Sequence, residues 1–240
     1  MSDQVSIRNY ITRQKQMSES MLLNLLLAFS GGFQDAYTYI VRDKVFANAQ
    51  TGNIVLMSTY LMEGKWQRGF MYLFPIFSFM LGIFISDNVQ HRFRAAKKLH
   101  WRQGIVLAEI AIMLVVGFLP QSVNMLANCM ISFACALQVQ SFKKVHGNVY
   151  ANTMCIGNLR SGVSAFSNYL RTRDAKDLGK ARDYIVVIVV FALGAGIGGN
   201  SSLIFGEKTI WTSAVLLLIC FLMMGLDKRA DDKHPERGNL

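Results

Sequence analysis

Several polar residues interrupt the apolar stretches of this sequence, and their side chains are of the kinds that bind ions and small solutes. Asp35 and Glu109 are the single acids of two apolar stretches, and Arg160 is the single basic residue of a third. A carboxylate in hydrocarbon costs roughly 2.5–3.5 kcal/mol on membrane-insertion scales, so each charge is expected to face the protein interior or water. The uncharged members form two groups: Gln34, Asn48, Gln50, Thr51 and Asn53 in the first half of the chain, and Gln138, Asn152 and Asn158 in the second.

These residues predict a binding site for a substrate or an ion, in which Asp35 and Glu109 could couple the movement of that solute to a proton or cation. Amide and hydroxyl oxygens can hold a cation, whereas a half-helix that begins near Thr51 would direct free N–H groups toward an anion. Arg160 could bind an anionic substrate or neutralise Asp35, and the sequence does not rank these two roles.

A purely structural role for the same residues is the alternative. The amides could satisfy one another where the two halves of the chain meet. Asp35 could be held by Arg42, by Arg160 or by backbone donors, and Glu109 could form a helix–helix contact.

The composition identifies the setting in which these residues act. Of 240 residues, 52% are hydrophobic and only 17% are charged, which leaves too few polar side chains to cover a soluble domain of this size. Apolar runs of about twenty residues are long enough to cross a hydrocarbon core of ~30 Å. We therefore expect an integral membrane protein of α-helices, with membrane lipids and an unknown small solute or ion as partners and a homo-oligomer compatible with the sequence.

The net charge of +10 does not indicate nucleic acid binding, because the basic residues lie between the apolar runs and not on one soluble face. No metal site or cofactor is expected, since the four cysteines fall in apolar stretches without a CxxC pair and the four histidines lack ligand spacing. Enzyme signatures such as GxSxG, HExxH and the P-loop are absent, so an enzyme is not expected. Two alternatives to transport remain: a membrane scaffold or regulator, and an intramembrane enzyme that uses Asp35 and Glu109 as an acid–base pair.

Eight segments stand out by hydropathy. Two of them are weak, because Asn, Gly, Thr and Ser interrupt them: Val45–Met62 and Val149–Leu170. The other six are strongly apolar and predict spanning helices: Met21–Val41, Gly69–Val89, Gly104–Leu119, Met125–Phe142, Tyr184–Phe205 and Thr209–Leu226. In the fifth of these, Gly194, Gly196, Gly198 and Gly199 have a spacing that favours close helix packing.

An internal repeat relates the two halves. Residues 33–48 match residues 137–152 at an offset of 104, and Phe79–Gly82 matches Phe191–Gly194 further on. After one inserted residue, Gly52 and Asn53 match Gly157 and Asn158. Many transporter folds are built from repeats of this kind. The predicted organisation is a cytoplasmic segment (1–20), a first membrane repeat (21–119), a second membrane repeat (120–226) and a cytoplasmic tail (227–240), with both repeats in one membrane domain.

Loop charge distinguishes two arrangements of the weak segments. If both segments span, 14 Lys and Arg residues lie inside and 10 outside; if both enter and leave on one side, 19 lie inside and 5 outside. The second distribution fits a cytoplasmic excess better. It predicts an all-α fold of six transmembrane helices and two broken or re-entrant elements, built as an inverted internal repeat with both termini in the cytoplasm. Irregular backbone at membrane depth must line a cavity or pack in protein, so these elements should form the site near the midplane.

Two motifs resemble a known family. The stretch Ser30–Tyr39, followed by Val45–Asn53, is similar to the hallmark of the YoaK-like family of bacterial membrane proteins, and Gly157–Arg160 fits its second-half element. The resemblance extends from Leu22 to Leu226. It implies about six spans and a bacterial plasma-membrane location, and it brings no settled biochemical activity.

The six-crossing arrangement predicts that Lys65 and His100 lie on opposite sides of the membrane, because one crossing separates them. Cysteine accessibility or reporter fusions at the two positions measure this directly. Finding both positions on the same side would refute the arrangement.

Overall fold

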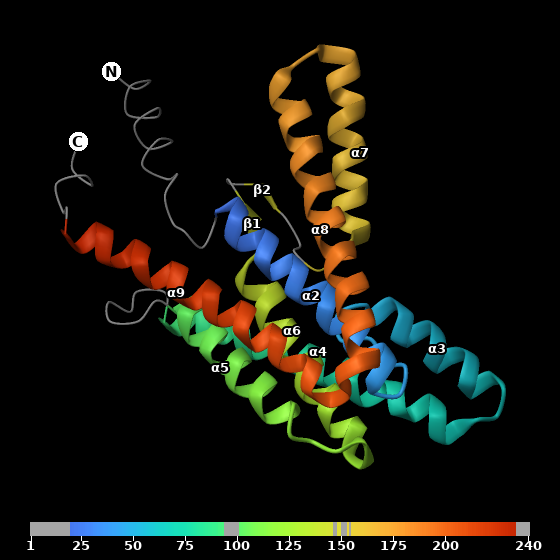
Figure 1. Ribbon diagram of the computed structural model, residues 1–240. Coiled ribbons are helices and arrows are strands. Elements are labelled where there is room, and N and C mark those ends of the chain that lie inside the picture. Colours follow the sequence, from blue (N-terminus) through green and yellow to red (C-terminus); the bar gives the residue numbers. More distant parts are fainter. Residues whose placement is uncertain (1–19, 94–100, 146–147, 150–152, 154, 234–240) are drawn as a thin grey trace.

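The computed structural model describes residues 20–93, 101–145, 148–149, 153 and 155–233. Almost all of these residues are helical (Figure 1). The α-helices are α2 (Met21–Val41), α3 (Gln50–Met62), α4 (Trp66–Phe93), α5 (Trp101–Val116), α6 (Asn124–Ser141), α7 (Cys155–Thr172), α8 (Ala175–Phe205) and α9 (Trp211–Lys233). Two 3₁₀ turns, η2 (Gln121–Val123) and η3 (Gly206–Ile210), precede α6 and α9.

The all-α prediction is confirmed with one small exception. A two-residue ladder joins β1 (Lys144–Val145) to β2 (Asn148–Val149) in antiparallel register. Hydropathy does not detect this hairpin, because each strand contributes too few residues to give a period. Pairing satisfies backbone groups of a short connection between two helices.

Every segment marked by hydropathy contains a helix. The helix extends beyond the apolar segment where polar residues are also helical. α8 begins at Ala175 and not at Tyr184, because Asp174 caps its first turn by accepting a hydrogen bond from the Lys176 N–H at 2.9 Å. Conversely, both weak segments begin with non-helical backbone. Their helices, α3 and α7, start only at Gln50 and Cys155.

Local chemistry defines the ends of α2, which carries the candidate acid Asp35. Ser20 caps the N-terminus, where its hydroxyl accepts a hydrogen bond from the Leu23 N–H at 3.3 Å. At the other end, Asp43 and Lys44 adopt φ values of 60° and 63°. Two successive left-handed residues cannot continue a right-handed helix, so the chain turns back after Val41.

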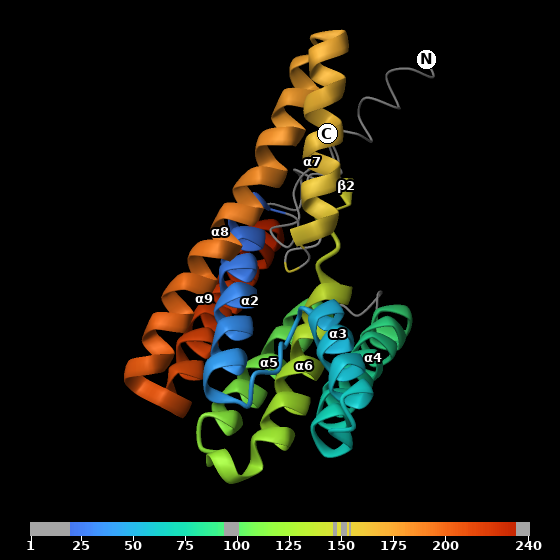
Figure 2. The same ribbon diagram turned by 90° about the vertical axis from the view of Figure 1, so that its right-hand side faces the viewer.

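The helices pack in pairs that join distant parts of the chain. α2 lies along α8, α4 along α6, and α5 along α9. Two hairpins, α3 with α4 and α7 with α8, extend from these pairs in different directions (Figures 1 and 2). The core lies where α2, α5, α6 and α9 meet, and it includes the fully buried side chains of Leu27, Met113, Ile131 and Leu217.

Glycines bring α2 and α8 into close backbone contact. A Cβ atom added to Gly194 would collide with the carbonyl oxygen of Phe29, and one added to Gly198 would lie 2.8 Å from the Cα of Phe33. The packing predicted for these glycines is therefore confirmed at Gly194 and Gly198. Gly196 differs, because no atom lies within 4 Å of the position its Cβ would take.

Within the part of the chain that the structure describes, three helical stretches are long and apolar enough to cross a membrane: Trp66–Phe93, Gln121–Ser141 and Ala175–Gly225. Large apolar side chains are exposed along them, for example Phe77 and Phe84 of α4 and Leu193 and Leu203 of α8. Soluble proteins rarely expose such apolar area, so these surfaces suggest a membrane protein whose helices contact lipid.

The glycine packing yields a matched pair of substitutions. Gly194→Ala should lower the free energy of unfolding by roughly 1–3 kcal/mol, because the new methyl group meets backbone that cannot move aside. Gly196→Ala should leave it unchanged or raise it by up to about 1 kcal/mol through helix propensity. Thermal unfolding of the two purified variants in the same detergent tests this. Equal melting temperatures would contradict the packing described for α2 and α8.

Candidate functional site

Asp35 lies in the middle of α2 and is 7% exposed. Its Oδ1 accepts a hydrogen bond from the backbone N–H of Asn48 at 2.6 Å. The backbone N–H groups of the neighbouring residues Ala47 and Ala49 also lie near this carboxylate. Three successive backbone amides thus lie beside one buried acid.

These amides belong to the segment that follows α2, residues 42–49, which returns to the middle of the helix. Asn48 Nδ2 donates to the carbonyl oxygen of Gly31 at 3.2 Å, four residues before Asp35. Since α2 continues to Val41, the chain travels back along roughly half of the helix before α3 begins. The first weak segment therefore enters the protein and leaves again in α3.

The side-chain amides of Gln50 and Asn53 form hydrogen bonds with the backbone of this returning segment. Asn53 is fully buried, and it donates to the carbonyl oxygen of Phe46 at 2.7 Å while accepting from the Phe46 N–H at 2.9 Å. Gln50 Nε2 donates to the Ala47 carbonyl at 2.8 Å, and Gln50 Oε1 accepts from Asn53 at 2.9 Å. Gln50 and Asn53 are thus used to satisfy backbone. Thr51 is exposed on the other side of α3 and does not join them.

The second weak segment reaches the same place on α2. Thr153 is 5% exposed, and its Cγ2 occupies the space that a Cβ atom would take at Gly31. The Asn48 amide nitrogen lies 3.7 Å from that position. Cys155, the first residue of α7, is close enough to interact electrostatically with Asp35. The two interrupted elements therefore meet at Gly31.

Two oxygen atoms at this meeting point have no hydrogen-bond partner among the described residues. They are the Asn48 Oδ1 and the Thr153 Oγ1. Both side chains are 5% exposed, so bulk water does not reach them freely. Buried polar atoms without a partner are uncommon, and each requires an explanation, such as a bound water, ion or substrate.

A chain of polar contacts links this point to neighbouring helices. Cys135 on α6 donates from Sγ to the Gln34 Oε1 at 2.8 Å, and Gln34 Nε2 donates to Ser30 Oγ at 3.0 Å. Ser30 in turn donates to Ser213 on α9 at 3.3 Å. The matching amide of the second half, Gln138, donates to the Leu27 carbonyl at 3.3 Å. The two glutamines therefore hold α2 against α6.

Glu109 is the second buried acid and lies on α5. It is 1% exposed, and its Oε1 has no hydrogen-bond partner in the part of the chain that the structure describes. Cys135 is close enough to interact electrostatically with both Asp35 and Glu109. No hydrogen bond or ion pair joins the two acids among the described residues.

The other candidates from the sequence lie in different surroundings. Asn158 is buried on the α8-facing side of α7, whereas Arg160 is exposed on the same helix. Arg160 forms no ion pair with Asp35 among the described residues. Asn152 lies outside the residues that the structure describes.

From the sequence, Arg42 is expected only as one possible partner of Asp35, and its structural role is not predicted. Its side chain is fully buried, and it bonds elsewhere. Its guanidinium donates to the carbonyl oxygens of Val116 and Leu119 at the end of α5 (3.0 and 2.9 Å), to Asn124 (2.9 Å) and to Tyr37 (3.0 Å). Arg42 thus caps the C-terminus of α5 and fixes the end of α2 to it.

Arg42 should be required for stability and should not tolerate lysine. A lysine ammonium carries its donors on one nitrogen atom, so it cannot bond to the α5 carbonyls, Asn124 and Tyr37 at the same time. We expect Arg42→Lys to lower the free energy of unfolding by roughly 3 kcal/mol or more, the cost of a buried charge that loses partners. Thermal unfolding in detergent measures this, with Arg68→Lys, an exposed arginine, as the control. An unchanged melting temperature for Arg42→Lys would contradict the capping role.

Comparisons with known proteins identify the family and no individual relative. A family model described as "Protein of unknown function (DUF1275)" matches residues 23–223, which is most of the chain. No curated protein and no solved structure matches. The chain belongs to the DUF1275 family.

Proposed function

We propose that this protein is a transporter or channel for a small solute or ion, located in a bacterial plasma membrane. In this proposal it crosses the membrane six times and has no enzymatic activity. The observation that carries the proposal is the meeting of two interrupted segments, one from each half of the chain, beside the buried acid Asp35. Transporters with inverted repeats bind substrate at such a position.

Matching contacts in the two halves support the repeat. A Cβ atom added to Gly82 would lie 2.6 Å from the carbonyl oxygen of Phe133, and one added to Gly194 would meet the carbonyl oxygen of Phe29. Gly82 matches Gly194 in the sequence repeat, and Phe29 precedes Phe133 by the repeat offset of 104. The same contact is thus made twice, between α4 and α6 and between α8 and α2.

The helix directions support an inverted relation between the halves. In Figures 1 and 2, α2 and α6 run in opposite directions, and so do α5 and α9. These are the helices that the repeat pairs with one another. A rotation that exchanges the paired helices therefore reverses the direction of each half relative to the membrane. This is the relation expected for a repeat whose axis lies in the membrane plane.

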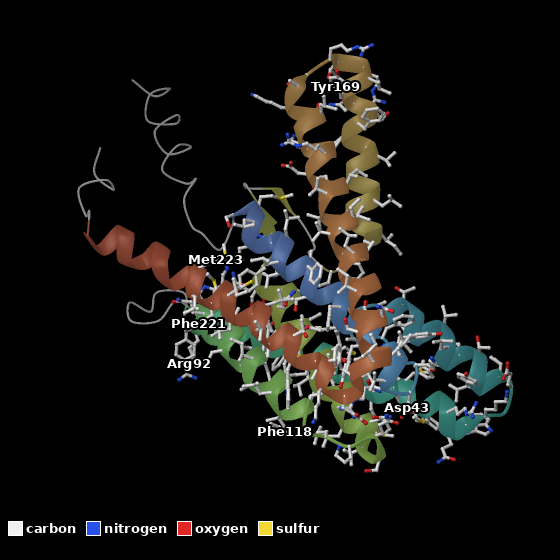
Figure 3. The ribbon with its side chains drawn as sticks, in the orientation of Figure 1. Asp43, Arg92, Phe118, Tyr169, Phe221 and Met223 are labelled. Carbon is white, nitrogen blue, oxygen red and sulfur yellow. The ribbon has the colours of Figure 1, made fainter. Side chains whose placement is uncertain are left out.

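Charge and position together support the orientation. Figure 3 shows Asp43 and Phe118 toward one end of the bundle and Arg92 and Met223 toward the other. Figure 3 also places Tyr169, at the tip of the α7–α8 hairpin, away from Asp43 and Phe118, and this hairpin contains the basic residues Arg171 and Arg182. We assign the end that carries Arg92 to the cytoplasm, because Lys and Arg concentrate on that side.

The alternatives predict different properties for the same residues. A scaffold or regulator needs only a sealed polar core, in which buried polar atoms satisfy one another. The unpartnered oxygens of Asn48 and Thr153 favour a binding site over a sealed core. An intramembrane enzyme would need Asp35 and Glu109 to reach one substrate from two different helices, α2 and α5.

Flux measurements on proteoliposomes test the transport proposal. Asp35→Asn keeps the size of the side chain and removes its charge, so it should abolish coupled flux while the protein remains folded in the membrane. Asp87→Asn is the control, because Asp87 lies at the surface and its Oδ1 accepts a hydrogen bond from Gln140 at 2.7 Å. This variant should keep wild-type flux.

Flux is measured for Na⁺, K⁺, Cl⁻ and protons with radioactive tracers and pH-sensitive and potential-sensitive dyes. Folded Asp35→Asn protein with wild-type flux at every pH would make Asp35 structural. Folded wild-type protein that moves none of these ions and no small organic solute would favour the scaffold.

A further inference from the structure

We infer that the solute bound beside Asp35 is a monovalent cation, held by the Asp35 carboxylate, the Asn48 Oδ1 and the Thr153 Oγ1. This inference rests on the proposed function and adds the class of the transported species. Its starting point is the pair of unpartnered oxygens at the junction of the two interrupted segments.

The orientation of the Asn48 amide determines what it offers to a ligand. Its Nδ2 donates to the Gly31 carbonyl at 3.2 Å, and exchanging the amide nitrogen and oxygen would place two acceptors against each other. The Oδ1 is therefore the amide atom that the contact with Gly31 leaves available. An amide oxygen only accepts hydrogen bonds, so a donor or a cation must satisfy it.

Thr153 adds a second oxygen from the other half of the chain. Its methyl group fills the space above Gly31, and an added Cβ at that glycine would lie 3.4 Å from the Thr153 Cβ. The absence of a side chain at residue 31 is thus what allows Thr153 to approach α2. Its hydroxyl is buried and without a partner among the described residues.

The charges around this point favour a cation over an anion. Asp35 is the acid at the junction, and Cys155 approaches it from α7 without contributing a positive side chain. Arg42 is engaged at the end of α5, and Arg160 is exposed. Among the residues that the structure describes, no basic side chain pairs with an anion at this point, and an anionic substrate would face a carboxylate and an amide oxygen that only accepts.

The single carboxylate also indicates the charge of the cation. Ca²⁺ takes 6–8 oxygen ligands, usually including several carboxylates, whereas this junction contributes one acid and neutral oxygens. The amides of residues 47–49 offset part of the acid's charge. One partly neutralised carboxylate with an amide oxygen and a hydroxyl matches an alkali cation that has shed part of its water.

Equilibrium binding to the purified full-length protein tests the inference without requiring transport. The protein is held in N-methyl-D-glucamine chloride, and NaCl or KCl replaces that salt at constant ionic strength while the melting temperature is recorded. A ligand of the native state raises the melting temperature saturably. We expect one of these two cations to do so.

Three variants locate the response. Thr153→Val keeps the methyl contact with Gly31 and removes the hydroxyl, so the apparent Kd should rise roughly tenfold, as expected for loss of one charge-assisted contact. Asp35→Asn should abolish the response. Ser202→Ala is the control, because Ser202 is another buried hydroxyl without a partner among the described residues, located on α8. Its Kd should stay within about twofold of the wild type, since it contributes no ligand.

Three results would overturn the inference: no saturable shift with either cation, a shift that follows the anion when chloride is replaced by sulfate or gluconate, or an unchanged Kd in Thr153→Val. The proposed function fails separately. Saturable cation binding without flux of that cation would overturn transport and keep the cation site, whereas flux without cation binding would do the reverse.

Discussion

The hydrogen bond from the backbone N–H of Asn48 to the Asp35 carboxylate is the interaction on which the centre of this protein depends. Hydrocarbon provides no partners for backbone polar groups, so a segment that enters a membrane without helical bonds must find partners in the protein. Asp35 accepts from the returning segment in the middle of α2, and Asn53 satisfies both backbone groups of Phe46. These bonds allow α3 to begin inside the protein.

Close approach of backbones is the second requirement, and glycines meet it. Gly32 contacts the backbone of Phe191, and Gly194 contacts that of Phe29, which brings α2 and α8 together. Gly31, on the same helix, leaves room for Thr153. One short stretch of α2 therefore provides the acid, the space for the second half and the contact with α8. The proposed site is asymmetric, because Val139 stands where the repeat would place a second Asp35.

The sequence predicts a helix accurately where charged residues lie just beyond its ends, because the apolar run then begins and ends at the same residues as the helix. The bounds of α2, Met21–Val41, equal the predicted segment for this reason. The burial of Asp35 was also predictable, since an acid within such a run must avoid lipid. The early start of α8 was not, because its first turns are polar and only capping by Asp174 marks them.

Two details of the site depend on tertiary contacts that no local pattern contains. Arg42 follows an apolar run and resembles an ordinary loop cation, yet its partners are carbonyls of Val116 and Leu119, far away in the sequence. The sequence groups Thr51 with its polar neighbours, whereas the three-residue spacing of Gln50 and Asn53 places only those two on one face of a helix. That spacing separates Thr51 from the other two, and Thr51 is exposed.

Cross-linking of Asn48 to Thr153 tests most directly whether the two interrupted segments meet at Gly31. Cysteines are introduced by Asn48→Cys and Thr153→Cys in a chain whose four native cysteines are replaced by alanine, and Thr51→Cys with Thr153→Cys is the control pair. After mild oxidation in membranes, mass spectrometry of the linked peptides should find an intramolecular disulfide in the first pair and little in the control. No disulfide in a folded first pair, or equal yields in both pairs, would contradict the convergence of the two segments.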